Sequence, residues 1–377
     1  MGRKLRVGVL LGGRSVEHSV SLLSARYVLE GLRGSKYEVV PIGISPEGRW
    51  MRLRELPAAD VKFLTGDDGP NNPVDTGPTA HDLIGLTTPP RIGSGGEGRV
   101  DVVFPVLHGR YGEDGTVQGL LEMANIPYVG SGVLASALGM DKAMMKVMFE
   151  KEGIPVTDYL VVRDSQFRKT DGGLQRRVRE KFGFPCFVKP ANSGSSVGVT
   201  RVENEVDLPA ALEEAFRFDR KALVEEAVAG REIECSVLGN HEPIASVPGE
   251  VVPHRDFYDY RAKYLEEGSR LLIPAPLEEE TADRLRDLAV RAFLALECSG
   301  MARVDFFLEK ETGRILVNEL NTIPGFTAIS MYPRLWEATG IGREKLLDRL
   351  IELALERHRE KNAKQTRYLP DGSANGK

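Results

Sequence analysis

Three polar side chains near the end of the sequence have the types and spacing of a metal site. Asp305 and Glu319 lie in two successive apolar segments, about equally far from the turn between them. Antiparallel pairing would therefore bring the two carboxylates together. Asn321 lies two residues beyond Glu319 and shares its face of the strand. Hard oxygen ligands of this kind suit Mg²⁺ carrying the phosphates of a nucleotide, whereas a pair of exposed edge residues is the ordinary alternative.

Positive charge and a flexible loop accompany these ligands. Arg303 lies two residues before Asp305, where its guanidinium could stabilise negative charge on a reacting carbonyl oxygen; a surface ion pair is the alternative. Residues 193–198 form a Gly/Ser loop between two strand-like segments, with Lys189 at its entrance. The N–H groups of such a loop can surround phosphate oxygens. An ordinary hairpin explains the loop alone equally well.

Two further turns could bind the rest of a substrate. His108 and the turn motif Gly-Glu-Asp-Gly at 112–115 follow an apolar segment ending at Leu107, at the strand end where open α/β sheets place ligands; an ordinary turn is the alternative. Beyond Asn321, Gly325 allows a close backbone approach, and a helix start near Ser330 would suit a carboxylate.

Two other patterns favour different enzymes. The G-x-S-x-G motif at 194–198 is that of a nucleophile elbow, but the strand-like segment 197–202 follows it where an elbow needs a helix. A serine hydrolase is therefore disfavoured. The G-x-G-x-x-A motif at 130–135 lies in a strand-to-helix turn, so nicotinamide binding stays open as the weaker hypothesis.

The elements that must position these residues follow from hydrophobic periodicity. The strand 5–11, an amphipathic helix through Val20, Leu23 and Val28, and the strand 37–44 begin a parallel α/β sheet. The strands 100–107 and 126–129 continue it after a polar insertion at about 57–98.

The second half of the sequence predicts two further domains. The expected strands are 155–162, 186–190, 197–202, 222–228, 233–238, 301–308 and 314–320, and the expected helices are 134–152, 282–296 and 343–358. The first helix carries Met140, Met144 and Met148 at four-residue spacing, which indicates a buried stripe. We expect domains at 1–130, 131–227 and 228–361, with a polar tail at 362–377.

Composition excludes several classes. The 50 Lys+Arg and 55 Asp+Glu residues give a net charge of −5, which argues against a nucleic-acid or membrane-binding surface. There is neither a signal peptide nor an apolar run of the roughly 18 residues that a membrane span needs. The three widely spaced cysteines indicate core thiols of a reducing compartment, so we expect a cytoplasmic protein.

Together these segments resemble the D-alanine:D-alanine ligase family of the ATP-grasp superfamily, from Val7 to about His358. The resemblance rests on LLGGRSVEHSVSLLSA (10–25), HGRYGEDGTVQGLLE (108–122), MDK (140–142), VKPANSGSSVGV (188–199), VEEAVAGREIE (224–234), FYDYRAKY (257–264), ARVDFF (302–307) and VNELNTIPGFTAIS (317–330). It implies an α/β protein, α+β in its C-terminal half, with a three-domain ATP-grasp architecture and an N-terminal parallel α/β domain.

The resemblance also implies a role for each residue that matches the family's motifs. ATP would contact Lys142, Lys189, Ser196, Glu225, Val228, Glu232 and Lys263, with Glu225 and the Val228 backbone at adenine and Glu232 at the ribose. Two Mg²⁺ ions, replaceable by Mn²⁺, would bridge Asp305, Glu319 and Asn321. The first D-alanine would lie near Glu17, Val20 and His108, with Glu17 hydrogen-bonded in a set with Ser195 and Tyr264. Arg303 and the Gly325 N–H would bind the oxyanion, and Ser330 and the Met331 N–H would bind the second substrate.

The implied reaction joins two D-alanine molecules through a D-alanyl phosphate, for synthesis of peptidoglycan precursors. D-Serine or D-lactate as second substrate is the alternative, although Tyr264 favours an amine. Homodimers are common in this family, so we expect one here.

Overall fold

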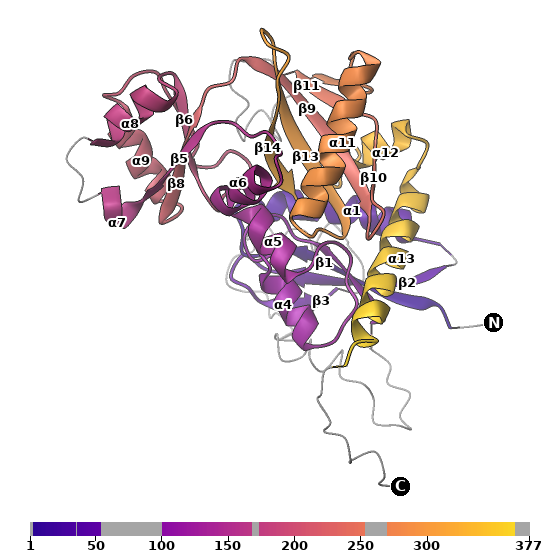
Figure 1. Cartoon of the computed structure of the whole chain (residues 1–377). Helices are drawn as coiled ribbons and strands as arrows, with labels where there is room; N and C mark the ends of the chain where they lie inside the picture. The colour runs from indigo at the N-terminus through magenta and orange to yellow at the C-terminus, as the bar shows by residue number, and fades with distance from the viewer. Residues whose placement is uncertain (1–2, 35, 54–99, 168–172, 253–269, 366–377) are drawn as a thin grey trace, which may run out of the picture.

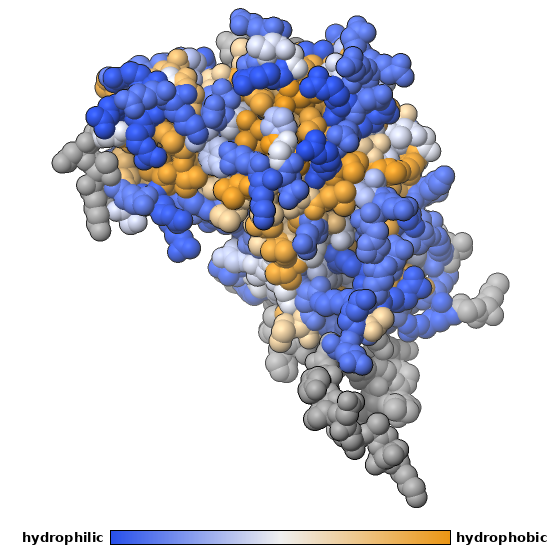
Figure 2. Space-filling model, in the orientation of Figure 1, coloured by the Kyte–Doolittle hydropathy of each residue, from blue (hydrophilic) through white to orange (hydrophobic). Residues whose placement is uncertain are grey.

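The fold consists of three sheets with helices packed on them (Figure 1). The computed structural model describes residues 3–34, 36–53, 100–167, 173–252 and 270–365. The predicted insertion at 57–98 and most of the polar tail lie outside these residues. On the face shown in Figure 2, hydrophilic residues dominate the surface and apolar residues show between them. Among the described helices, each is too short or too polar to cross a bilayer.

The N-terminal sheet has the order β3-β2-β1-β4. Its elements are β1 (Leu5–Gly12), α1 (His18–Leu32), β2 (Tyr37–Ile44), β3 (Trp50–Arg52), β4 (Val102–Val106) and α4 (Thr116–Met123). β1 pairs in parallel with β2 and β4, as predicted. The predicted strand 126–129 is wrong, since only an isolated bridge joins Tyr128 to Val103. In α1, Val20 and Val28 are buried as predicted, but Leu23 is 59 % exposed and Leu22 is buried in its place.

The central sheet is antiparallel, in the order β5-β8-β6-β7. Its elements are β5 (Tyr159–Arg163), α7 (Asp164–Phe167), α8 (Gly173–Lys181), β6 (Cys186–Pro190), β7 (Thr200–Val202), α9 (Leu208–Phe216) and β8 (Lys221–Glu226). This confirms the predicted small antiparallel unit, which lies at one side of the molecule (Figure 1).

The third sheet is built round the long strands β9 and β13, in the order β12-β11-β9-β13-β14 with β10 beside β9. Its elements are β9 (Gly230–Gly239), β10 (Ile244–Ala245), β11 (Gly249–Val252), β12 (Arg270–Leu272), α11 (Glu279–Ala295), β13 (Gly300–Glu309), β14 (Ile315–Asn321), α12 (Met331–Ala338) and α13 (Arg343–Asn362). α11 packs its apolar face on β9 and β13. α13 joins the N-terminal core through Leu346, Leu350 and Ile351.

The predicted helix 134–152 is two helices, α5 (Val133–Met140) and α6 (Lys142–Lys151). Asp141 separates them because it has an extended backbone and its carboxylate accepts the N–H groups that begin α6. The break changes the direction of the following side chains. Met140 is buried and Met148 packs partly buried against the core, as predicted, but Met144 is 44 % exposed and Met145 takes the buried position.

Candidate active site

A cleft of about 630 Å³ lies between the central and third sheets. Its walls include six of the predicted nucleotide and metal residues: Lys142, Lys189, Ser196, Val228, Glu232 and Glu319. They come from α6, β6, the 193–198 loop, the segment after β8, β9 and β14. Residues far apart in sequence therefore meet here, as the hypothesis of a nucleotide site requires.

The predicted pairing of the two carboxylates is confirmed. Asp305 on β13 lies opposite Glu319 on β14. Arg303 binds Asp305 with both Nε and Nη2, each at 2.7 Å, so the two side chains share a face as the spacing predicts. Asn321 Nδ2 donates to Asp305 Oδ2 at 3.1 Å. The three oxygen-bearing side chains thus form one cluster.

Sequence reasoning missed a further carboxylate in this cluster. Glu234 on β9 lies opposite Asp305 on the other side of β13. Its Oε2 lies 2.9 Å from Arg303 Nε, so Arg303 lies between two carboxylates. A sequence signal existed, since Glu234 lies two residues after Glu232 on a strand and must share its face.

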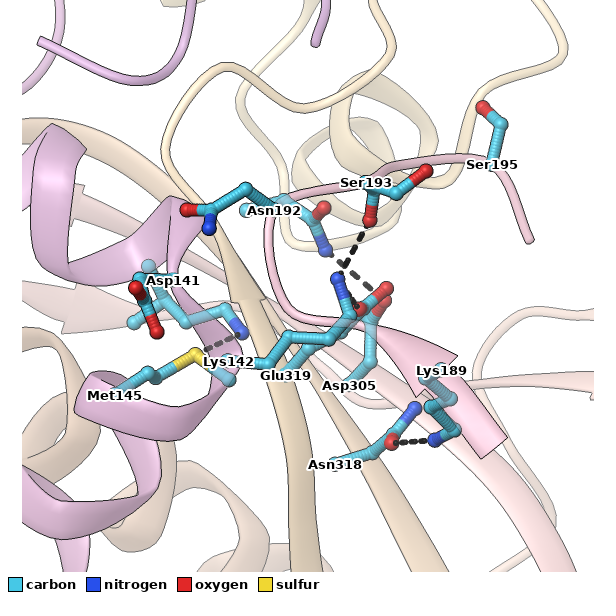
Figure 3. Close-up of polar contacts among 12 residues, drawn as sticks. Asp141, Lys142, Met145, Lys189, Asn192, Ser193, Ser195, Asp305, Asn318 and Glu319 are labelled. Carbon is cyan, nitrogen blue, oxygen red and sulfur yellow. Dashed lines mark hydrogen bonds and ion pairs between the residues drawn. The ribbon is translucent and has the colours of Figure 1, made fainter. Parts of the chain in front are cut away.

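A β-bulge in β14 sets which side chains reach the cleft. The register moves from Asp305–Glu319 to Phe306–Val317, which leaves Asn318 without an opposite residue on β13. Consecutive strand residues normally point to opposite faces, yet Asn318 and Glu319 both line the cleft. Lys189 Nζ donates to Asn318 Oδ1 at 3.2 Å, and Lys142 Nζ lies 3.2 Å from Glu319 Oε2 (Figure 3). The bulge therefore gives each lysine its own partner on one strand.

The donor set fits Mg²⁺. Asp305, Glu319 and Asn321 offer carboxylate and amide oxygens, which Mg²⁺ prefers, and Arg303 and Lys142 now lie against the two carboxylates. Within the described ranges, no group of three or more His, Cys, Asp or Glu residues is arranged to hold an ion. An ion here would therefore need the Asn321 amide and phosphate oxygens of a nucleotide as further ligands.

The Gly/Ser loop has the backbone of a phosphate-binding turn. Ser195 and Ser196 have φ of 49° and 58°, and Gly198 has φ of 75°. Such left-handed positions turn successive N–H groups toward one side. The loop leads into β7, so the nucleophile-elbow interpretation is excluded. Lys142 Nζ donates to the Ser193 carbonyl at 2.8 Å, and the Ser195 hydroxyl donates to Glu17 Oε1. Ser195 lies at the far end of the loop from Asp305 and Glu319 in Figure 3.

Glu225 lies behind the cleft wall. It is 2 % exposed, and its Oε2 accepts from Lys189 Nζ at 2.7 Å. Its Oε1 lies 3.5 Å from Nζ of Lys146, which is buried. Burial opposes the charge of Glu225, but the two lysines outweigh it and lower its pKa. An adenine contact of Glu225 stays a prediction.

His108 follows β4 and connects it to α1 and to the turn after β14. Its Nδ1 lies 3.0 Å from the Ile323 carbonyl, and its Nε2 lies 2.9 Å from Ser24 Oγ. Burial lowers the pKa of His108, which favours the neutral ring. Since a carbonyl only accepts, Nδ1 carries the proton and Nε2 accepts from Ser24. Both ring nitrogens are thus engaged, and His108 holds the Ile323 turn against α1.

Glu17 and Glu113 lie beside this histidine; the sequence placed Glu113 in the 112–115 turn motif but indicated no role for it. Its two carboxyl oxygens accept from the N–H groups of Gly109, at 2.7 Å, and Ile323, at 3.2 Å. Loss of solvent around the carboxyl, together with Glu17, raises the pKa of Glu113 to about 8. Its position in the 112–115 turn motif was the available signal. Val20 is buried in α1, one turn after Glu17.

The turn after β14 leads to the N-terminus of α12. Ser330 is the N-cap residue, and its Oγ accepts from the Thr327 N–H at 3.0 Å. A Cβ on Gly325 would lie 3.1 Å from Ser330 Oγ, so this turn is compact. Met331 begins α12 and is buried. The structure therefore brings Gly325, Ser330 and Met331 together.

Comparison with known proteins identifies the family of this chain. The model of the D-ala D-ala ligase N-terminus matches residues 6–131, and that of the D-ala D-ala ligase C-terminus matches residues 148–352. The chain belongs to the D-alanine–D-alanine ligase family. It is 47 % identical to the D-alanine–D-alanine ligase of Acetivibrio thermocellus, over 96 % of this chain and 98 % of that protein. It is 48 % identical to that of Geobacillus thermodenitrificans, over 95 % and 97 %.

Solved structures agree with this membership of the D-alanine–D-alanine ligase family. The D-alanine–D-alanine ligase of Coxiella burnetii has a TM-score of 0.80 and 36 % identity, covering 96 % of this chain and 97 % of that one. The VanG D-Ala:D-Ser ligase of Enterococcus faecalis has a TM-score of 0.79 and 35 % identity, covering 93 % and 100 %. The predicted ATP-grasp fold is thereby confirmed.

The alternative of nicotinamide binding fails in this member of the D-alanine–D-alanine ligase family. A Cβ on Gly300 would lie 3.2 Å from the Gly130 nitrogen, so β13 packs directly on the 130–135 turn. Arg357 Nη1 donates to the Gly130 carbonyl at 2.6 Å. The glycines therefore serve packing.

Two predicted residues of the D-alanine–D-alanine ligase site, Lys263 and Tyr264, lie outside the described residues. Their roles stay predictions.

Proposed function

We propose that this chain joins two D-alanine molecules to D-alanyl-D-alanine, with ATP converted to ADP and phosphate. The observation that carries the proposal is the cluster of Arg303, Asp305 and Glu319, in which Glu319 lines one cleft together with Lys142 and Lys189. A carboxylate is a poor electrophile, and phosphorylation by ATP supplies a leaving group. The amine of the second D-alanine then displaces phosphate from the D-alanyl phosphate.

The cleft residues bind ATP. Lys142 and Lys189 hold its phosphates together with the N–H groups of the 193–198 loop and the Ser196 hydroxyl. Val228 and Glu232 lie along the cleft wall, where they contact adenine and ribose. Two Mg²⁺ ions, held by Asp305, Glu319 and Asn321, would neutralise phosphate charge; Mn²⁺ would also suit these oxygen ligands.

The remaining residues bind the amino acids. Glu17 binds the ammonium group of the first D-alanine, and His108 and Val20 shape that pocket. Arg303 and the Gly325 N–H stabilise the tetrahedral oxyanion during amine attack. The carboxylate of the second D-alanine lies at the N-terminus of α12, where it is bound by Ser330 and the Met331 N–H.

The resemblance assigns the remaining two roles to Lys263 and Tyr264. Lys263 would contact the transferred phosphate, and Tyr264 would join Glu17 and Ser195 while the site excludes water. Tyr264 also favours an amine over D-lactate as second substrate. D-Serine is the second candidate, because a D-Ala:D-Ser ligase has a similar structure at a TM-score of 0.79.

The deciding experiment measures phosphate release from ATP and Mg²⁺ with D-alanine, L-alanine, D-serine or D-lactate, alone and in pairs with D-alanine. We expect release with D-alanine alone, and D-alanyl-D-alanine as product by mass spectrometry. Failure of D-alanine to stimulate release would overturn the proposal. A higher rate with D-alanine plus D-serine would identify D-serine as the second substrate and leave the rest of the proposed reaction unchanged.

We further propose that the protein acts in the cytoplasm as a homodimer and supplies peptidoglycan precursors. Analytical ultracentrifugation tests the dimer, and a particle of monomer mass at micromolar concentration would reject it. Complementation of a strain that lacks its own D-alanine–D-alanine ligase tests the role in the cell.

A further inference from the structure

Lys146 is a buried cation to which the reaction above gives no role. It lies on α6 one helical turn after Lys142, and its side chain is 0 % exposed. A lysine is almost never fully buried unless its charge is paired. Its Nζ donates to Thr157 Oγ1 at 2.6 Å and lies 3.5 Å from Glu225 Oε1. The ring centre of Tyr159 lies 5.5 Å away.

Glu225 connects this lysine to the nucleotide cleft. One of its oxygens faces Lys146, and the other accepts from Lys189 Nζ at 2.7 Å. Lys189 lines the cleft, whereas Lys146 and Glu225 lie one layer behind it. One buried carboxylate is therefore shared between a buried lysine and a lysine that can reach a ligand.

The net charge of the group formed by Glu225 and its lysine partners depends on Lys146. A pair of Glu225 and Lys189 alone would be neutral, and the carboxylate would hold the Lys189 ammonium against the wall. With Lys146 present, two lysines and one carboxylate leave a net positive charge at the cleft. Low solvent exposure makes this charge act strongly on a bound polyphosphate.

We propose that Lys146 is a positioning residue for the nucleotide: it compensates the charge of Glu225 and leaves the Lys189 ammonium available to the ATP phosphates. The inference rests on the proposed role of Lys189. It predicts that Lys146 affects ATP without affecting D-alanine, because Lys146 contacts Thr157, Glu225 and Tyr159 and none of the residues proposed to bind D-alanine.

The test replaces Lys146 by methionine, which keeps the chain length and removes the charge. We expect the KM for ATP to rise about tenfold, the factor that corresponds to loss of one charge-assisted contact, with the KM for D-alanine unchanged. Lys151→Met is the matched control, since Lys151 is exposed on the same helix. An unchanged KM for ATP in folded Lys146→Met would overturn the inference.

Two further variants separate charge from packing. In a Glu225→Gln background no carboxylate needs compensation, so the addition of Lys146→Met should leave the KM for ATP of Glu225→Gln unchanged. A tenfold rise on this addition contradicts the inference, and this comparison also decides if Lys146→Met alone does not fold. Thr157→Val keeps both charges and should lower only the melting temperature. A raised KM for ATP in Thr157→Val would assign the effect to packing.

Lys189→Met distinguishes the two proposals. If its KM for ATP is unchanged, the proposed role of Lys189 fails. If it rises while that of Lys146→Met does not, only the inference about Lys146 fails.

Discussion

Arg303 is the residue whose position carries most of the proposed chemistry. Two carboxylates, Asp305 and Glu234, hold its guanidinium from two sides. A cation fixed in this way needs little reorganisation when negative charge develops on the substrate. Its contribution should therefore appear in turnover more than in binding.

We predict that Arg303→Ala lowers kcat by roughly 100-fold or more, the typical loss for an oxyanion donor, and changes the KM for ATP much less. Steady-state kinetics with each substrate varied measures both effects. Arg314→Ala is the control, because Arg314 binds Glu309 at the exposed turn of the same hairpin. Equal losses in kcat and ATP affinity would show that Arg303 acts mainly on the nucleotide.

Glu113 makes a pH-dependent contribution to stability. Its folded pKa of about 8 lies above the ordinary value of 4.5 for a glutamate, with Glu17 and Arg303 as its charged neighbours. A carboxyl with a raised pKa stabilises the fold fully below its unfolded pKa and loses that contribution as the pH rises through the folded value. The contribution of Glu113 to stability is therefore lost between about pH 4.5 and pH 8.

We predict that the difference in melting temperature between wild type and Glu113→Gln becomes smaller as the pH rises from about 6 to 9. The amide is destabilising at low pH because its NH₂ faces a backbone N–H donor, and it does not ionise at high pH. Thermal unfolding at a series of pH values tests this. A constant difference would indicate that Glu113 does not titrate in this range.

At the residue scale, the sequence predicted contacts that depend on strand alternation and hairpin symmetry. Asp305, Glu319 and Arg303 follow from those rules alone. Glu234 was missed and Glu113 was given no role because their partners lie on other strands and loops, and no local period reveals which strand becomes a neighbour. Glu225 was assigned to adenine, although its carboxylate binds two lysines.

At the scale of elements, the junction between α5 and α6 places Lys142 at the cleft. Asp141 accepts the N–H groups of Ala143 and Met144, at 3.2 and 3.1 Å, and its other oxygen accepts from Lys221 Nζ. The carboxylate thus starts the helix and joins it to β8. Its loss should disturb both stability and nucleotide binding.

We predict that Asp141→Ala lowers the free energy of unfolding by about 1–2 kcal/mol, as for other N-cap losses, and raises the KM for ATP. Urea unfolding and ATP titration measure the two effects. Asp207→Ala is the matched control, because Asp207 is the N-cap of α9 but its side chain makes no capping hydrogen bond. If both variants lose the same stability, the capping bond is not the cause.

The α5–α6 break shows why element boundaries were harder to predict than element types. An unbroken helix fits the apolar spacing over 134–152, and the capping signal of Asp141 was outweighed by that pattern. The bulge at Asn318 was invisible for a similar reason, since it depends on the pairing with β13.

At the scale of the whole molecule, the central unit contacts the N-terminal unit beside the active site. Arg110 follows His108 and Gly109 and donates through Nε to the Asn192 carbonyl at 3.1 Å, and through Nη2 to the Phe218 carbonyl. Ser195 and Glu17 make a second link. Arg110 and Ser195 thus join the proposed amino-acid site to the 193–198 loop and its neighbourhood.

We predict that Arg110→Ala raises the KM for both ATP and D-alanine a few-fold, because each site helps to order the other through this contact. The melting temperature should change little, since exposed contacts contribute little to stability. Arg217→Ala is the control: Arg217 is paired with Glu214 in the same region without crossing between units. A change in only one KM would argue against coupling.

The three sheets could be predicted from the sequence, but their relative placement could not. α13 packs on the N-terminal core although it is last in the chain, and Phe326 lies against Phe104 at a ring distance of 6.0 Å. Such contacts depend on side-chain fit between distant segments.

The bulge in β14 also determines where the gene can gain or lose codons. Deleting one residue between the hairpin turn and Asn318 would absorb the bulge, so that Asn318 takes the place of Val317 opposite Phe306 and directs its amide into the apolar core. The turn at 310–313 precedes the strand and is exposed, so length changes there leave the register intact. Homologues should therefore vary in length at this turn and keep a constant number of residues from Ile315 to Asn321.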